Sequence, residues 1–177
     1  MMMKHALLCL TILVFASSSL LGQSQTANEV KSAKITLSGD SELETKIAAK
    51  TIRIVVSTYK VDLGSPNPTP PPTGEAKTNC TYSRFPCNQV SNLKIWVAGK
   101  RLFVPRSVFA DRADVGSMSV ASEAGMNVLT LNGGDASEGY TLKVFFDAGH
   151  VKKRELYDVE SNSLLQVTTY LPPPKLD

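Results

Sequence analysis

Residues that could carry out covalent chemistry are few in this sequence. His150 is its only histidine after position 5. A serine or cysteine nucleophile needs a neighbouring base such as histidine, and no GxSxG elbow accompanies His150. One histidine also falls short of the three or four nitrogen or sulfur ligands of a zinc site. We therefore expect no catalytic residue, no metal and no cofactor, with His150 as a surface residue of a hairpin loop.

Two cysteines, Cys80 and Cys87, stand close together in the segment NCTYSRFPCNQ. Their spacing is not the CxxC of a redox pair, and two nearby cysteines in an oxidising compartment favour a disulfide bond. The third cysteine, Cys9, lies in an apolar N-terminal run. Asn79 begins a short glycosylation sequon, but a disulfide at its second position makes it a poor acceptor. We predict a structural Cys80–Cys87 disulfide.

One pair of carboxylates flanks a basic residue. Asp111 and Asp114 stand on either side of Arg112. Paired acids at a fixed separation in a cleft catalyse glycoside hydrolysis, so a carboxylate-dependent hydrolase is one hypothesis. The alternative, which we favour, is that these acids cap a turn and pair with Arg106 or Arg112.

A second acidic group lies in the turn-rich segment NGGDASEG. Asp135 and Glu138, with Asn132 and Ser137, could offer oxygen ligands to calcium. The EF-hand spacing is absent, and segments of Gly, Asp and Ser are common in turns. We favour an ordinary turn.

The N-terminal residues predict export. Lys4 and His5 precede an apolar run over residues 6–15, and small residues follow. This is the pattern of a secretory signal peptide, which we place at residues 1–22 with cleavage between 18 and 27. Loss of Lys4 lowers the formal net charge of +3 by one, too near neutral to predict a nucleic-acid partner. We expect a periplasmic or secreted protein with no membrane span after cleavage.

The rest of the chain reads as strands separated by turns, with almost no helical periodicity. The predicted fold is all-β: a small antiparallel β-sandwich, roll or partial barrel with a C-terminal meander and one disulfide-closed loop. Its segments are an N-terminal β segment at 28–60, a proline-rich loop at 61–78, a main antiparallel portion of the same domain at 79–171, and a tail at 172–177.

Three details of this scaffold matter for the site. Residues 51–59 alternate, with Ile52, Ile54 and Val56 on one face, whereas 41–50 fits one or two helical turns as well as extended structure. The basic run at 152–155 predicts a solvated or edge strand protected by lysines.

A hairpin is predicted from strands at 93–97 and 101–104. Gly99 at the first central position of a type II′ turn places Trp96 opposite Phe103. One face is then aliphatic and faces the core, and the other carries Lys94, Trp96, Arg101 and Phe103. This second face is either a small second core or an exposed contact surface, because Trp and Arg dominate binding hot spots. The sequence leaves both interpretations open.

The functional expectation is non-catalytic binding of a protein or a small ligand by an exported β-domain. An inhibitor or immunity-type protein, which blocks an enzyme with a rigid loop, is the alternative. The carboxylate-dependent hydrolase is a third hypothesis.

Overall fold

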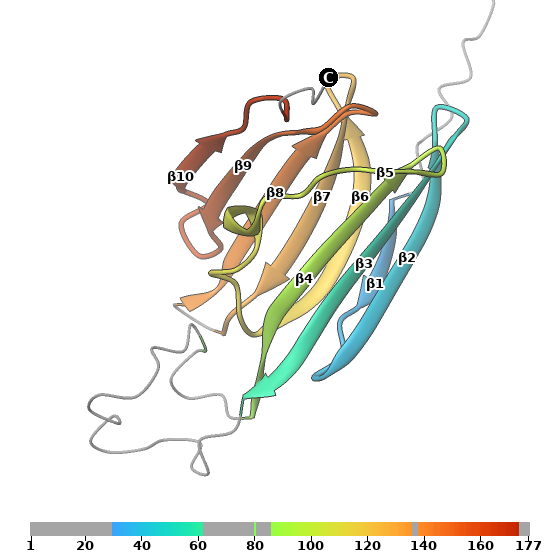
Figure 1. Cartoon of the computed structure of the whole chain (residues 1–177). Coiled ribbons are helices and arrows are strands. Elements are labelled where there is room, and N and C mark those ends of the chain that lie inside the picture. Colours follow the sequence, from blue (N-terminus) through green and yellow to red (C-terminus); the bar gives the residue numbers. More distant parts are fainter. Residues whose placement is uncertain (1–29, 62–79, 81–85, 136–137, 174–177) are drawn as a thin grey trace, which may run out of the picture.

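The computed structural model describes residues 30–61, 80, 86–135 and 138–173 (Figure 1). The signal peptide expected at 1–22 and nearly all of the proline-rich loop lie outside these residues. The six-stranded sheet has the order β1 (Lys31–Lys34), β6 (Val115–Glu123), β7 (Met126–Gly133), β8 (Tyr140–Phe146), β9 (Val151–Asp158) and β10 (Leu164–Thr169). The four-stranded sheet has the order β2 (Gly39–Ile47), β3 (Lys50–Val61), β4 (Cys87–Val97) and β5 (Lys100–Arg101).

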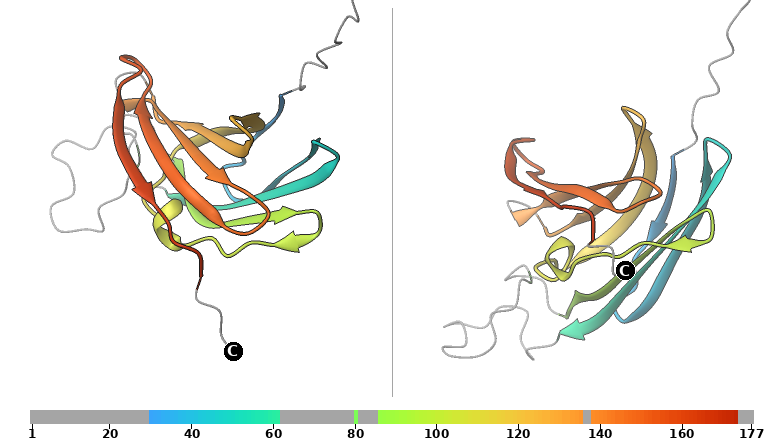
Figure 2. Two further views of the ribbon diagram at one scale, coloured as in Figure 1. Left: turned by 90° about the horizontal axis from the view of Figure 1, so that it is seen from above. Right: turned by 45° about the horizontal axis from the view of Figure 1, so that its top comes forward.

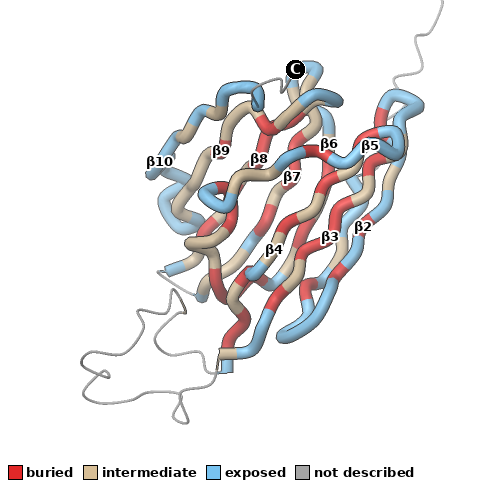
Figure 3. Tube along the Cα trace, viewed as in Figure 1, coloured by how far each residue is buried: buried red, intermediate tan, exposed pale blue. Residues whose placement is uncertain are grey.

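The two sheets pack against each other around one apolar core. All strand pairs in the described residues are antiparallel, and β6 to β10 form the predicted meander. The alternation in β3 buries Ile52, Ile54 and Val56 completely, and the facing sheet contributes residues such as Met118 and Leu142. Figure 3 shows buried residues along the middle of both sheets. The prediction of an all-β antiparallel fold is confirmed, and neither sheet closes into a barrel within the described part of the chain.

A two-residue turn joins β2 to β3. The segment left open by the sequence is extended: β2 reaches Ile47 and turns through Ala48 and Ala49 into β3. Both alanines have positive φ, 47° and 63°, as a type I′ hairpin turn requires. The right-handed twist of the strands favours this turn even where no glycine is present.

The predicted register of the β4–β5 hairpin is wrong by two residues. Trp96 lies opposite Arg101, not Phe103, because the central turn residues are Ala98 and Gly99. Their φ angles are 50° and 80°, so Gly99 is the second central residue of a type I′-like turn, not the first of a type II′ turn. The alternation survives the correction, since a shift of two residues keeps each side chain on its face.

The segment after β5 crosses the open part of the six-stranded sheet (Figures 1 and 2). It contains a 3₁₀ turn at Arg106–Val108. Leu102, Val108 and Phe109 are buried in the core. This crossing segment therefore completes the core where the four-stranded sheet ends.

Candidate functional site

Four side chains form a row across the outer surface of the four-stranded sheet. Glu44 on β2 pairs in register with Arg53 on β3, Arg53 with Trp96 on β4, and Trp96 with Arg101 on β5. Residues directly opposite each other in an antiparallel sheet have side chains on the same face. The row therefore aligns a carboxylate, a guanidinium, an indole and a second guanidinium.

Trp96 is held by both guanidinium groups. The Arg53 guanidinium carbon lies 4.8 Å from the indole centroid, and that of Arg101 lies 5.8 Å away, within the range of cation–π attraction. Arg53 is itself oriented by Glu42, which accepts bonds of 2.6 and 2.8 Å from Nε and Nη2. The hydrogen bond between them lowers the pKa of Glu42 and raises the pKa of Arg53. Trp96 is half-buried, with two charged groups against its ring.

The other two residues of the expected contact surface lie beside this row. Lys94 precedes Trp96 by two positions on β4, and its Nζ lies 4.0 Å from an oxygen of Asp40. Phe103 follows the buried Leu102 and is 64% exposed. The bond from Leu102 N–H to the Ile95 carbonyl, 2.9 Å, continues the corrected register. One step further in that register, Phe103 would face Lys94 and not Trp96.

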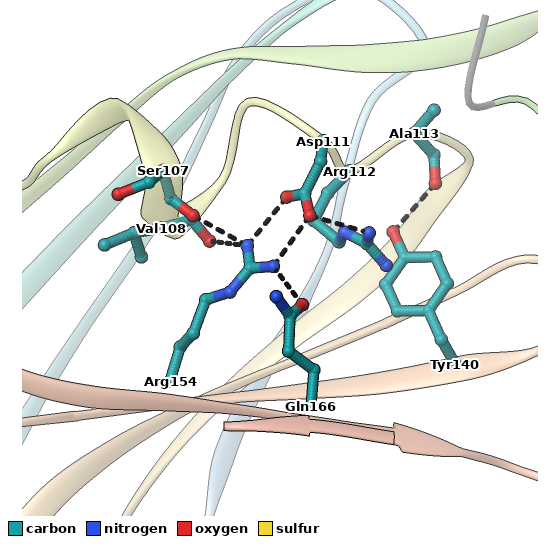
Figure 4. A network of polar contacts seen from close by, with 8 residues as sticks. All are labelled: Ser107, Val108, Asp111, Arg112, Ala113, Tyr140, Arg154 and Gln166. Atoms are coloured by element: carbon teal, nitrogen blue, oxygen red, sulfur yellow. Dashed lines mark hydrogen bonds and ion pairs between the residues drawn. The ribbon is translucent and has the colours of Figure 1, made fainter. Parts of the chain in front are cut away.

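A second polar cluster, shown in Figure 4, ties the crossing segment to the six-stranded sheet. The Arg154 guanidinium donates to both carboxylate oxygens of Asp111, each at 2.7 Å. It also donates to the carbonyls of Ser107 at 2.7 Å and Val108 at 3.2 Å, and to Gln166 Oε1 at 2.7 Å. Arg154 is 3% exposed. A charged group buried to this extent is stable only when hydrogen-bond acceptors surround it, as they do here.

Arg112 forms the other side of this cluster. Its Nη2 donates to Asp111 Oδ2 at 2.9 Å, and its guanidinium carbon lies 5.0 Å from the Tyr140 ring centroid. The Tyr140 hydroxyl donates to the Ala113 carbonyl at 2.7 Å. Burial, with a smaller contribution from nearby Asp114, raises the pKa of Tyr140. Pairing of Asp111 with Arg112 matches one of the partners expected from the sequence.

The chemistry open to Asp111 follows from these contacts. Burial by itself would raise its pKa, but hydrogen bonds from Arg154 and Arg112 outweigh burial and lower the pKa to about 2. Both of its oxygens accept guanidinium hydrogen bonds. This geometry suits a structural anchor, because a general acid or base works best with a pKa near the working pH.

A depression of about 370 Å³ adjoins the cluster. Asp111, Arg112 and Tyr140 line it on one side, with Leu156 and Leu165 among its apolar residues. The buried Nε atoms of Arg112 and Arg154 have no hydrogen-bond partner within the described residues.

The buried role of Arg154 was not predicted from the sequence. The run at 152–155 was expected on a solvated or edge strand, but β9 lies between β8 and β10. The strand alternation that places Arg154 on the same face as Leu156 was the available signal. It could not identify Asp111, 43 positions earlier, as the partner.

His150 and the second acidic group have ordinary local contacts. The His150 backbone N–H donates to Asp147 Oδ1 at 3.0 Å, and its Nδ1 lies 3.2 Å from Lys152 Nζ. Asp135 and Glu138 are exposed, and Ser137 lies outside the described residues. Within the described ranges no group of three or more His, Cys, Asp or Glu side chains could hold a metal ion.

The predicted disulfide is present. Cys80 and Cys87 are bonded, with 6.1 Å between their Cα atoms. Cys87 begins β4 and is buried, so the bond attaches Cys80 to the sheet. In the part of the chain that the structure describes, no helix has the length and apolarity needed to cross a membrane.

Comparisons with known proteins return no relative. No protein-family model matches the chain, and neither a curated protein nor a solved structure resembles it significantly.

Proposed function

We propose that this protein is exported and acts by non-catalytic binding of a protein partner. The contact surface is the Trp96 face, which we define as Arg53, Lys94, Trp96, Arg101 and Phe103. The observation that carries the proposal is that Trp96, held by two guanidinium groups, lies on the same face as Phe103, which is 64% exposed.

The composition of the Trp96 face supports protein recognition. Tryptophan and arginine are enriched among the few residues that dominate protein–protein binding energy. Phe103 offers a large apolar side chain that is still in contact with solvent, so its burial by a partner would be favourable. Lys94 and Arg101 at the rim would favour a partner with acidic residues around an apolar centre.

The order of the face supports it as well. Arg53 is fixed by two hydrogen bonds to Glu42, and Trp96 lies against it on a regular strand. Side chains already held in place lose less conformational entropy when a partner binds. A rigid sheet surface of this kind needs no rearrangement to present its aromatic groups.

Two observations support export. The N-terminal residues have the pattern of a signal peptide. The Cys80–Cys87 disulfide is of a kind that persists in oxidising compartments such as the periplasm or the cell exterior.

The test couples partner capture to matched variants. Purified protein would be used to capture proteins from the native periplasm or secretome, and the affinity of a recovered partner would be measured by titration. Trp96→Ala and Phe103→Ala should each weaken binding by at least about tenfold, as expected for hot-spot residues. Val30→Ala is the control, since Val30 is also exposed but precedes β1 on the other sheet.

Circular dichroism and thermal melting would confirm that the variants fold. Fluorescence offers a second measurement, because Trp96 is the only tryptophan of the chain. A partner at this face should change its emission and protect it from quenching. A partner that binds all three variants equally, without changing Trp96 emission, would contradict the proposal.

A further inference from the structure

The four edge strands of the two sheets differ in how they are protected against pairing with another chain. A charged side chain on an edge strand discourages such pairing. β1 carries Lys31 and Lys34, β2 carries acidic residues at alternate positions, and β5 consists of Lys100 and Arg101. β10 is the exception, with the sequence LLQVTT and no charge.

The β10 edge is apolar and exposed. Leu164 is 51% exposed, Leu165 60% and Val167 51%. No charged residue occurs between Glu160 and the end of the described chain at position 173. Gln166 nevertheless bonds the buried Arg154 at 2.7 Å, so the strand is held on the sheet and not frayed.

Hydrogen-bonding groups of β10 point away from the sheet. Tyr170 N–H donates to the Lys152 carbonyl at 2.8 Å, and Thr168 lies opposite Arg154. Because antiparallel pairs alternate between bonded and non-bonded positions, the amides of Val167 and Thr169 face the open edge. An extended strand placed there would find unpaired donors and acceptors.

The charged residues at the two ends of the β9–β10 hairpin indicate in which direction a second copy of this strand would pair with the β10 edge. Asp158 and Glu160 lie at the turn, next to the start of β10. Lys152 and Lys153 lie beside the end of β10, where Thr169 pairs with Lys153. Each lysine also has a carboxylate partner within its own chain, Asp147 at 2.8 Å and Glu155 at 2.6 Å. A second copy placed antiparallel would keep Asp158 and Glu160 of the two copies apart, beside the lysines of the other copy, whereas a parallel copy would bring these carboxylates together.

We propose that β10 pairs antiparallel with β10 of a second copy of this chain, joining two six-stranded sheets into one continuous sheet. The dimer has two-fold symmetry, so each strand uses the same residues. Assembly stops at two copies, because the other edge of this sheet, β1, carries Lys31 and Lys34. The interface lies on a different sheet from the Trp96 face and does not depend on the proposed function.

The size of the contact sets the expected strength. A six-residue strand pair buries less than the roughly 1,200 Å² of a standard stable interface. The dimer should therefore be weak and depend on protein concentration. Added salt should weaken it further, since the opposite charges at the hairpin ends are exposed to solvent.

Sedimentation velocity of the mature protein across micromolar to millimolar concentration tests the proposal. The wild type should shift from monomer to dimer as concentration rises. Val167→Lys should remain monomeric, because it places a charge at the centre of the pairing edge. The matched control Val30→Lys changes a residue of similar exposure, 59%, before β1, and should dimerise like the wild type.

Hydrogen exchange gives an independent readout. The amides of Val167 and Thr169 should exchange more slowly at dimer-forming concentration than in dilute solution, while those of Thr168 and Tyr170 should change little. A wild type that stays monomeric throughout would overturn the proposal, as would a dimer that survives Val167→Lys or is lost equally in Val30→Lys. A monomer that binds an added extended peptide at β10 would assign the edge to a foreign strand and reject self-pairing.

Discussion

Arg154 on β9 holds both carboxylate oxygens of Asp111, with Nη1 to Oδ1 and Nη2 to Oδ2 each 2.7 Å apart. The same guanidinium donates to the carbonyls of Ser107 and Val108. One side chain of the six-stranded sheet therefore fixes the 3₁₀ turn and the carboxylate that follows it. The crossing segment owes its position over the core to this contact as well as to its buried apolar residues.

Arg154→Met should destabilise the fold by about 3 kcal/mol or more, because it removes the donor to the Ser107 and Val108 carbonyls and leaves the Asp111 carboxylate with Arg112 alone. Arg154→Lys should rescue little of this loss, since an ammonium group lacks the planar fork that bonds both carboxylate oxygens. Urea unfolding followed by circular dichroism measures both variants. A Lys variant as stable as the wild type would show that the positive charge at position 154 stabilises the fold, and not the planar geometry of the guanidinium group.

Protonation of Asp111 should lower the stability of the protein in acid. Its pKa is about 2 in the folded protein, below the ordinary value of 3.8. A group whose pKa is depressed by folding stabilises the protein above its unfolded pKa, and that contribution is lost as pH falls toward the folded pKa. We expect the loss between about pH 4 and pH 2.

Asp147 also has a pKa of about 2, so the contribution of Asp111 needs a separate control. Asp111→Asn should lower stability at neutral pH and flatten the acid dependence, while the Asp147 contribution remains. Melting temperature measured against pH for the wild type and the variant gives the difference. Identical pH profiles would contradict a role for Asp111.

The turn between β2 and β3 offers a stabilising substitution. Ala48 and Ala49 both have positive φ, a conformation that is unfavourable for most residues with a Cβ, better tolerated by Asn and unstrained for Gly. Ala48→Asn combined with Ala49→Gly should raise the free energy of unfolding by about 1 kcal/mol. Ala121→Gly within β6 is the control and should lower stability, since glycine weakens a strand interior.

Gly133 at the end of β7 should not tolerate a side chain. A Cβ there would lie 2.5 Å from the Tyr140 hydroxyl oxygen and 2.8 Å from the Asp114 carbonyl oxygen. Gly133→Ala should therefore cost about 1–3 kcal/mol, as overpacking does. Gly116→Ala is the matched control, because the nearest atom to its Cβ is 3.8 Å away. Thermal unfolding would compare the two variants, and equal stability would contradict the close packing of Tyr140.

Sequence patterns predicted much of the strand framework. Alternation in β3 and β4 predicted which residues enter the core, and the turn signals predicted the C-terminal meander. The helical alternative for 41–50 arose because Ser41 with Glu44 has the spacing of a capping box. Leu43 and Ile47, four positions apart, fit one face of a helix as well as one face of a strand. The hairpin register was missed because local rules do not expect Ala98, with a φ of 50°, at a turn position where glycine is preferred.

By itself, the sequence determined the all-β class, the inward faces of β3 and β4 and the Cys80–Cys87 pairing, because these depend on periodicity and on residues close in the chain. Tertiary structure alone decided that Arg154 is buried against Asp111 and that β10, and not β9, is the open edge. Both outcomes depend on which distant segments meet. From residue type alone, an arginine is expected at the surface and apolar strand residues in the core. Arg154 is buried because Asp111 and two carbonyls accept its hydrogen bonds, and the apolar residues of β10 are exposed because no further strand pairs with this edge in the described residues.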